Sequence, residues 1–334
     1  MSWHVRPARA ADLDALHALA QNTGPGFTNI PQAYDGMAAR LAWHLDSLGS
    51  ALEAPGDHLY MLVLVDEDGT IGGTAMLFGE IGVEWPFYSY HIARYAQTSK
   101  ALKRTITSEL LNLTTEFSGA SEVGGLFLRE DLRAGGTGLG NLLARSRYLF
   151  IAQHRARFGK RLIAELRGWL TPDGESPFWD ALGRPFFEMG FPEANRFNTE
   201  NGNQFIADLM PKHPVYTVML PEAARAVMGK PHDVGTPAMR LLEREGFHYD
   251  RYIDIFDGGP TFCVATDEVR TLATSHAGPL DPAAPADAVR HLVAAGHLKN
   301  FRAWASAAER AGDGWRLADA HGLGPNEEVR CVPA

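Results

Sequence analysis

A glycine-rich turn at residues 133–140 contains the residues best suited to bind a ligand. It reads Arg-Ala-Gly-Gly-Thr-Gly-Leu-Gly and lies between an apolar segment, 122–128, and a predicted helix that runs to about residue 157. Glycines let consecutive main-chain N–H groups converge, and the N-terminus of the following helix adds partial positive charge. Such a turn can bind a pyrophosphate with few cationic side chains. The alternative is a flexible surface loop that only caps the helix, and the strand–turn–helix context favours the pyrophosphate site.

The spacing within this turn separates it from other phosphate-binding motifs. No Gly-Lys-Ser/Thr follows, as a P-loop requires, and no acidic residue ends a later strand at the spacing of a Rossmann fingerprint. Instead, Arg133-x-x-Gly136-x-Gly138 resembles the R/Q-x-x-G-x-G/A motif of the GNAT acyltransferase superfamily. The resemblance implies that the turn binds the pyrophosphate of an acyl-CoA. The expected acyl-CoA-binding residues are Leu126, Arg133, Gly135, Gly136, Thr137, Gly138, Leu139 and Gly140.

The same resemblance gives a role to the strand before the turn. In the GNAT superfamily this strand usually carries a bulge, and the amide that the bulge frees polarises the thioester carbonyl. Gly124 and Gly125 would permit such a bend in this chain, because glycine within a strand often marks a bulge or a close backbone approach. Leu126 is therefore expected to supply the amide.

Three longer segments extend the resemblance from the GNAT superfamily to one family. They read SPFWDALGRPFFEMGF (176–191), FIADLMPKHPVYTVML (205–220) and YIDIFDGGPT (252–261), and they are similar to the arginine/ornithine succinyltransferase family. The resemblance implies transfer of a succinyl group from succinyl-CoA to the α-amine of L-arginine, giving N2-succinylarginine and CoA in arginine catabolism. Three alternatives stay open: ornithine as the acceptor, a GNAT N-acyltransferase of other specificity, and a mainly structural subunit of a heteromeric succinyltransferase.

A general acid is expected at His232, within the Gly- and Pro-containing segment 228–237. Many GNAT enzymes protonate the departing thiolate with a tyrosine of a late helix, but Leu242 occupies that position here. An imidazole titrates near neutral pH and suits acid–base work. The family resemblance assigns the proton donor to the same histidine. The alternative is an ordinary loop histidine, one of 13 in the chain.

The sequence indicates no nucleophile for a covalent intermediate. Cys263 follows an apolar strand and has neither a helix N-terminus nor a basic neighbour to activate its thiol. We therefore expect direct attack by the amine within a ternary complex. A main-chain N–H would stabilise the oxyanion, and the leaving thiolate would take a proton.

A site that binds both a succinyl group and arginine requires positively and negatively charged side chains. A cation must bind the succinyl carboxylate and carboxylates must bind the guanidinium, commonly in bidentate geometry. The candidates lie in or near the matching segments, although residues of these types are more often structural: Arg167, Arg184, Asp254 and Asp257. No group of residues has metal-ligand spacing. We expect no metal and no permanently bound cofactor, with succinyl-CoA as a co-substrate.

The composition limits the partners and the location. The chain has 31 Lys and Arg against 40 Asp and Glu, a formal net charge of −9, which argues against a nucleic acid partner. No stretch approaches about 18 consecutive apolar residues, and the 2 cysteines cannot build a disulfide framework. We expect a cytoplasmic protein that does not bind membranes. The family resemblance implies a homodimer or a heteromer with a related subunit.

The order of predicted elements is typical of a mixed sheet with helices on its faces. Strands are predicted at 4–7, 60–65, 70–77, 122–128, 161–167, 215–220 and 252–256, and helices from about residue 11, at 36–48, at 98–117, after the glycine-rich turn and at 237–247. The fold class is therefore α/β (α+β). The expected architecture is a GNAT-type mixed central sheet with helices on both faces, as one unit or as two GNAT-like halves, with a small C-terminal β-rich segment.

Four regions are predicted along the chain. Residues 1–170 would form the acyl-CoA-binding region, and residues 171–270 an acceptor-side insertion with the remaining sheet and helix elements. Residues 271–290 are rich in Pro and Ala and read as a linker. Residues 291–334 would form the small C-terminal segment.

Overall fold

The computed structural model describes residues 3–22, 30–133, 137–201 and 204–334. Two compact units are each assembled from separate stretches of the chain. Unit 1 comprises Met1–Glu80, Ser121–Lys160 and Ala265–Ala334, and unit 2 comprises Ile81–Ala120 and Arg161–Val264. The turn predicted to bind the pyrophosphate therefore belongs to unit 1, and His232 belongs to unit 2.

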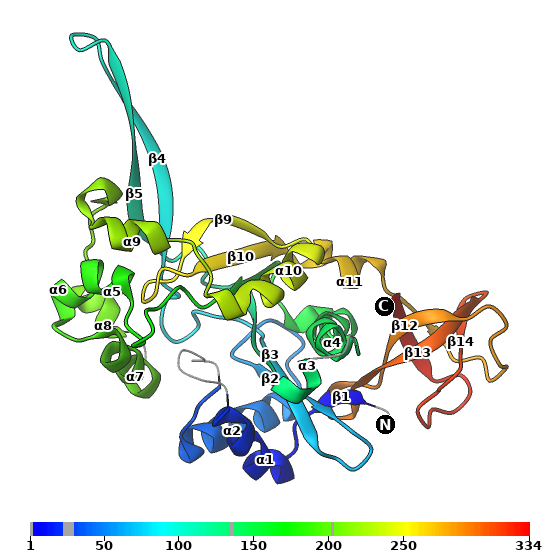
Figure 1. Ribbon diagram of the computed structural model, residues 1–334. Helices are drawn as coiled ribbons and strands as arrows, with labels where there is room; N and C mark the ends of the chain where they lie inside the picture. The colour runs from blue at the N-terminus through cyan, green and yellow to red at the C-terminus, as the bar shows by residue number, and fades with distance from the viewer. Residues whose placement is uncertain (1–2, 23–29, 134–136, 202–203) are drawn as a thin grey trace. The chain divides into compact units, whose positions relative to one another are not determined.

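Four antiparallel strands form the centre of the unit 1 sheet (Figure 1). Their order is β1 (His4–Pro7), β2 (Leu59–Val65), β3 (Ile71–Phe78) and β6 (Ser121–Leu128). The predicted hairpin between β2 and β3 is confirmed. Asp66 Oδ1 accepts the Thr70 N–H at 2.8 Å, and Gly69 has φ +83°, a value that glycine adopts without strain.

Helices cover both faces of these strands. On one face Phe78 contacts Trp43 of α2 (Tyr34–Gly49), with ring centroids 5.9 Å apart. On the other, Tyr60 contacts Phe150 of α4 (Leu139–Gln153) at 4.9 Å. Tyr60 pairs with the residue before Phe78, and successive side chains of a strand alternate between faces. Because both faces are covered, every residue of β2 and β3 is buried. The predicted mixed sheet with helices on both faces is confirmed.

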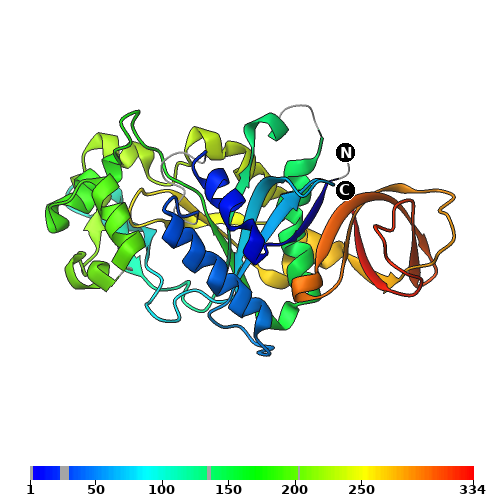
Figure 2. The same cartoon turned by 90° about the horizontal axis from the view of Figure 1, so that it is seen from below.

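The C-terminal residues extend the same sheet. Strand β13 (Arg302–Ala311) pairs with β1, and β12 (Val289–Ala295), β15 (Glu328–Pro333) and β11 (His276–Pro279) follow in that order, with β14 (Gly314–Leu317) paired to β13 (Figure 2). The predicted β-rich segment is thus confirmed. The stretch predicted as a linker, 271–290, contains β11 and most of α11 (Arg270–Thr274). The remaining helices of unit 1 are η1 (Ala10–Asp12), α1 (Leu13–Ala20), α3 (Glu130–Arg133), η2 (Arg155–Arg157), η5 (Thr266–Glu268) and η6 (Leu298–Asn300).

Unit 2 combines strands with short helices. The strand order is β7 (Arg161–Glu165), β10 (Pro260–Ala265), β9 (His248–Ile253), β4 (Ser89–Ser99), β5 (Arg104–Thr114) and β8 (Val215–Tyr216). The helices are α5 (Pro177–Leu182), α6 (Arg184–Phe187), α7 (Phe191–Asn201), α8 (Gln204–Leu209), η3 (Thr217–Met219), α9 (Glu222–Val227), η4 (Asp233–Gly235) and α10 (Thr236–Arg244).

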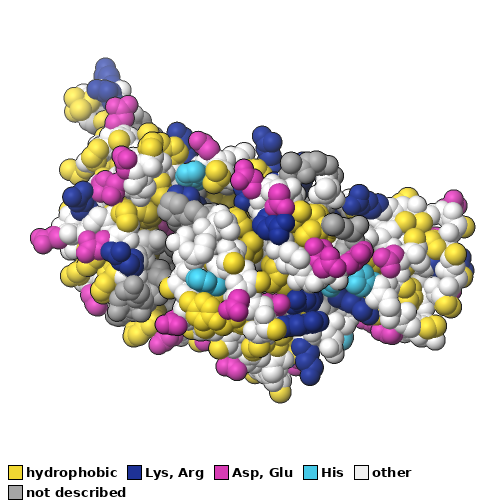
Figure 3. Space-filling view, turned by 60° about the horizontal axis from the view of Figure 1, so that its bottom comes forward, with side chains coloured by type: hydrophobic (Ala, Val, Ile, Leu, Met, Phe, Trp, Pro, Cys, Tyr) yellow, Lys and Arg dark blue, Asp and Glu magenta, His cyan; other side chains and the backbone are white. Residues whose placement is uncertain are grey.

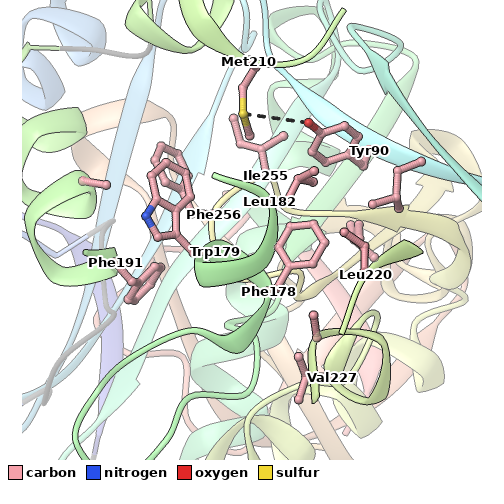
Figure 4. Close-up of a cluster of buried hydrophobic side chains, with 14 of the residues drawn as sticks. Tyr90, Phe178, Trp179, Leu182, Phe191, Met210, Leu220, Val227, Ile255 and Phe256 are labelled. Atoms are coloured by element: carbon pink, nitrogen blue, oxygen red, sulfur yellow. Dashed lines mark hydrogen bonds between the residues drawn. The ribbon is translucent and has the colours of Figure 1, made fainter. Parts of the chain in front are cut away.

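An aromatic core holds the short helices of unit 2 in place (Figure 4). The ring of Trp179 is fully buried and stacks on Phe187 at 5.3 Å and on Phe256 at 5.4 Å. Phe178 meets Tyr90 of β4 edge to face at 6.2 Å. Each such aromatic side chain removes a large apolar area from water, which offsets the weak intrinsic stability of helices of about one or two turns.

The helix predicted at 98–117 is wrong. Residues 89–114 form a long hairpin instead, with β4 and β5 paired from Ser89↔Thr114 to Ser99↔Arg104 (Figure 1). The Thr98 and Thr105 hydroxyls hydrogen-bond across the two strands at 2.9 Å. Threonine favours strands because its branched Cβ restricts χ1, and cross-strand pairs supply contacts that a single-sequence pattern does not reveal.

Candidate active site

A bulge interrupts β6 at the position predicted from its glycines. The pairing with β3 passes from Thr74↔Phe127 to Met76↔Gly124, so Gly125 and Leu126 together face one residue, Ala75. Gly125 has φ +54°, and a Cβ atom there would lie 2.8 Å from Met76 Cγ. Only glycine meets both the conformational and the spatial requirement. A bulge leaves its extra residue outside the ladder and redirects the main chain, and the strand therefore bends at the two residues that the sequence analysis singled out.

The N-terminus of α4 follows β6 and α3 along the chain. Gly138 is the N-cap residue with φ +77°, and Leu139 and Gly140 are the first two helical residues. The first main-chain N–H groups of a helix have no partner within it and carry the positive end of its dipole. Gly135 and Gly136, which were also predicted to bind acyl-CoA, lie outside the described residues.

Two arginines flank this turn in different ways. Arg133 Nε donates to the Leu128 carbonyl at 2.7 Å, and its guanidinium lies 5.1 Å from the centroid of the Phe127 ring. Arg290 of β12 donates from Nη2 to the Thr137 carbonyl at 3.3 Å. Sequence reasoning missed Arg290, because 153 residues separate it from Thr137 and no local motif marks it. These two cations and the helix end make the turn a suitable anion site.

The segment that contains His232 is fixed to two other parts of unit 2. Gly229 N–H donates to the Gly258 carbonyl and His232 N–H to the Arg167 carbonyl, each at 2.8 Å, while Pro231 forms an antiparallel bridge with Gly168. His232 is thereby held directly after the end of β7, although it is 65 positions from Arg167 in the sequence.

The protonation of the His232 ring follows from its contacts. Val234 N–H donates to Nδ1 at 3.3 Å, and because a main-chain N–H can only donate, the neutral ring carries its proton on Nε2. Burial and then the positive charge of Arg167 lower the pKa of His232, while Asp233 opposes them. The ring is therefore a neutral hydrogen-bond donor at neutral pH.

Arg167 lies beside this histidine, and Asp257 acts on Arg167. Asp257 is buried and accepts N–H groups from Gly168 at 2.7 Å and from Gly259 at 2.8 Å. Burial, followed by the charge of Asp254, raises the pKa of Asp257. Burial lowers the pKa of Arg167, and Asp257 opposes that shift. Arg167 Nε is buried without a hydrogen-bond partner in the described part of the chain.

The other two predicted substrate residues make local contacts. Asp254 accepts the N–H groups of Phe256 at 2.7 Å and of Asp257 at 2.8 Å, which closes the turn after β9. The Arg184 side chain is 60% exposed and pairs with Asp180 one helical turn away, at 3.4 Å. Of the four predicted substrate residues, Arg167 lies beside His232, and Asp257 acts on Arg167.

A cavity of about 410 Å³ adjoins the same segment. Gly229 and Pro231 line it together with Glu243 of α10 and the rings of Tyr249 and Phe262. Within residues 3–22, 30–133, 137–201 and 204–334, no group of His, Cys, Asp and Glu could hold a metal ion, and no helix could span a membrane. The face drawn in Figure 3 intersperses acidic and basic side chains.

Comparisons with known proteins converge on one family. The model of the family described as "Arginine N-succinyltransferase beta subunit" matches residues 3–271. The chain is 41% identical to the arginine N-succinyltransferase subunit beta of Pseudomonas aeruginosa, over 81% of this chain and 79% of that protein. It is 39% identical to the arginine N-succinyltransferase of Salmonella paratyphi B, over 90% and 87%. The solved structure of the arginine/ornithine succinyltransferase subunit AI of Pseudomonas aeruginosa superposes with a TM-score of 0.87 and 31% identity, covering 99% of this chain and 98% of that one.

Proposed function

The chain belongs to the arginine N-succinyltransferase family, and from this premise we propose that it transfers the succinyl group of succinyl-CoA to the α-amine of L-arginine. The products are N2-succinylarginine and CoA, which places the reaction in arginine catabolism. The chain is thus an acyl-CoA-dependent N-acyltransferase. The observation that carries the proposal is the bulge at Gly125 and Leu126 followed by the α4 N-terminus at Gly138.

The acyl-CoA is held by main-chain groups in this proposal. Its pyrophosphate accepts hydrogen bonds from the turn between Gly135 and Gly140, beside Arg133, where the helix dipole favours an anion. The Leu126 N–H donates to the thioester carbonyl oxygen. This donor is fixed before the reaction begins, so it stabilises the negative charge that develops on that oxygen without reorganising.

The reaction proceeds by direct attack. The α-ammonium group of arginine first loses a proton to water, and the nitrogen lone pair then attacks the thioester carbon. The tetrahedral intermediate collapses, the C–S bond breaks, and the thiolate accepts the proton from His232 Nε2. The nitrogen that becomes the amide releases its surplus proton, which restores the proton of the ring. The hydrogen bond from Val234 to Nδ1 supports this role, because it leaves the proton on the opposite nitrogen.

A covalent succinyl-enzyme is not part of the mechanism. Cys263 is buried, its sulfur lies 3.7 Å from His248 Nε2, and burial raises the pKa of its thiol. A thiolate, not a thiol, is the nucleophile in cysteine chemistry. Cys331 is also buried, with the pKa of its thiol raised by burial.

The test is thiol release by the purified chain. Succinyl-CoA and acetyl-CoA are each combined with arginine, with ornithine and with no acceptor, and free CoA is measured over time. We expect the fastest release from succinyl-CoA with arginine. Release from acetyl-CoA alone would exclude the succinyl assignment, and release with ornithine alone would assign ornithine as the acceptor.

The relatives also bear on assembly, since two of them are named as subunits. We propose that this chain works as a homodimer or in a heteromer with a related subunit. The β4–β5 hairpin supports assembly, because Tyr95, Leu102 and Ile106 are exposed along it and a two-stranded ribbon gains little stability alone. Light scattering on the purified chain distinguishes a monomer from a dimer. Activity of that chain without a second subunit would exclude a merely structural role.

A further inference from the structure

We propose that the guanidinium of Arg167 binds a substrate carboxylate beside His232. The inference deepens the proposed succinyl transfer and rests on it. Two carboxylates meet this description, the distal carboxylate of the succinyl group and the α-carboxylate of arginine. Both present two oxygens in a plane, which matches the N–H groups of a guanidinium.

The backbone pairing fixes Arg167 next to His232. Gly168 and Pro231 form an antiparallel bridge, and the His232 N–H donates to the Arg167 carbonyl at 2.8 Å. Arg167 and His232 are therefore opposite each other across this isolated bridge, which lies outside the named strands. The guanidinium is close enough to the ring for its charge to lower the pKa of His232. A carboxylate bound by Arg167 would thus lie within one small-molecule length of the proton donor.

The charge of Arg167 is incompletely compensated. Asp257 is the carboxylate that acts on it, but the Asp257 oxygens already accept the N–H groups of Gly168 and Gly259. Arg167 Nε is buried, and the described part of the chain supplies it with no hydrogen-bond acceptor. A buried donor without a partner is costly, and an arginine cannot avoid that cost by losing its proton. A ligand oxygen that accepts a hydrogen bond from Arg167 Nε would remove this cost.

Arg157 and Arg6, whose side chains are 1% and 11% exposed, provide the contrast. Arg157 donates to Glu53 at 2.8 Å and to the Ser50 carbonyl at 2.8 Å. Arg6 forms two hydrogen bonds with Asp12, at 2.6 and 2.9 Å. These guanidinium groups have protein acceptors and need no ligand. Arg167 Nε differs from them in this respect, and Arg167 lies opposite the predicted proton donor.

The test is a set of four substrate pairs assayed with the wild type and Arg167→Met. Succinyl-CoA is compared with butyryl-CoA, which has a methyl group in place of the distal carboxylate. Arginine is compared with argininamide, which lacks the α-carboxylate charge. With succinyl-CoA and arginine, kcat/KM should fall about 10- to 100-fold in the variant. If the fall disappears with butyryl-CoA, Arg167 binds the succinyl carboxylate; if it disappears with argininamide, Arg167 binds the α-carboxylate.

An equal fall with all four pairs would overturn the proposal, because Arg167 would then support the fold and not a carboxylate. Arg225→Met is the matched control, since it removes an exposed guanidinium of the same unit, and we expect it to change kcat/KM less than twofold. Arg167→Lys keeps the charge but loses the bidentate geometry, and it should recover part of the loss. If Arg167→Met does not fold, as judged by circular dichroism, Arg167→Lys is compared across the same four pairs.

Binding separates this proposal from the proposed function. Calorimetry with succinyl-CoA and with butyryl-CoA, without an acceptor, requires no turnover. A wild type that discriminates the two ligands, and an Arg167→Met variant that does not, would support a succinyl-carboxylate site even if arginine were not the acceptor. If the wild type binds both equally and the variant is equally impaired with arginine and argininamide, Arg167 binds neither carboxylate.

Discussion

Each unit of the chain contains one group of candidate site residues, and the two groups are of different chemical kinds. In unit 1, the β6 bulge and the α4 N-terminus present main-chain N–H groups, and glycines at Gly125 and Gly138 hold positive φ values. In unit 2, Arg167, His232 and Asp257 contribute side chains whose charges are set by burial and by one another. A site of the first kind depends on backbone shape, and a site of the second kind depends on charge. The two should therefore respond differently to substitution.

The largest effect is expected from the side-chain site. His232→Ala removes the proton donor, so kcat should fall about 10²- to 10⁴-fold while acyl-CoA binding is retained. Steady-state kinetics and calorimetry measure the two quantities separately. His213→Ala, at an exposed histidine of the same unit, serves as the control and should leave kcat unchanged. An unaltered kcat in His232→Ala would remove this residue from the mechanism.

The main-chain site should be broken by adding a single methyl group. Gly125→Ala introduces a Cβ 2.8 Å from Met76 Cγ at φ +54°, which costs on the order of 1–3 kcal/mol of stability. Because the bulge aims the Leu126 amide, kcat should fall about 10²-fold. Thermal unfolding and kcat are measured together.

Gly69→Ala is the matched control for this variant. Gly69 also has positive φ, +83°, but a Cβ there would have no atom within 4 Å. It should lose stability through backbone strain alone and keep its kcat. If both variants lose kcat in proportion to stability, the bulge has no special role in the reaction.

A smaller effect is expected at Arg290. Its contact with the Thr137 carbonyl places a cation at the turn, but the side chain is exposed, and exposed charge pairs contribute little. Arg290→Met should weaken CoA binding about two- to fivefold, and the difference should shrink at high salt. Arg310→Met removes an equal charge from β13 of the same unit and should leave binding unchanged. Equal losses in both variants would indicate only a general effect of net charge.

The smallest effect is a shift in the titration of His232. Burial and the charge of Arg167 hold its pKa below 6.5, so the folded chain favours the neutral ring. The associated stability is complete above the unfolded pKa and is lost as the pH falls through 6.5 toward the folded value. Arg167→Met removes a positive neighbour and should raise the pKa. NMR titration of the ring measures it, and a pKa that falls or stays constant would contradict the electrostatic coupling.

Local patterns predicted much of unit 1. The Asp-Gly turn between β2 and β3, the strand at 122–128 and the helix after the glycine-rich turn were all found, because turn residues and glycine positions act within a few residues. The hairpin at 89–114 was missed over most of its length. Its stability comes from pairing between strands and not from a local pattern, so a window of sequence with apolar residues at helical spacing was misleading.

The sequence alone determined the family and the position of the β6 bulge, because the bulge requires a residue at Gly125 that combines a positive φ with no Cβ. Tertiary structure alone decided which charged residues meet. In the folded chain, Arg167 lies opposite His232, and Asp254 closes a turn. Arg184 pairs with Asp180, and Arg290 donates to the Thr137 carbonyl. A charged side chain acts over a few ångströms, and chain folding, not sequence distance, fixes what lies within that range.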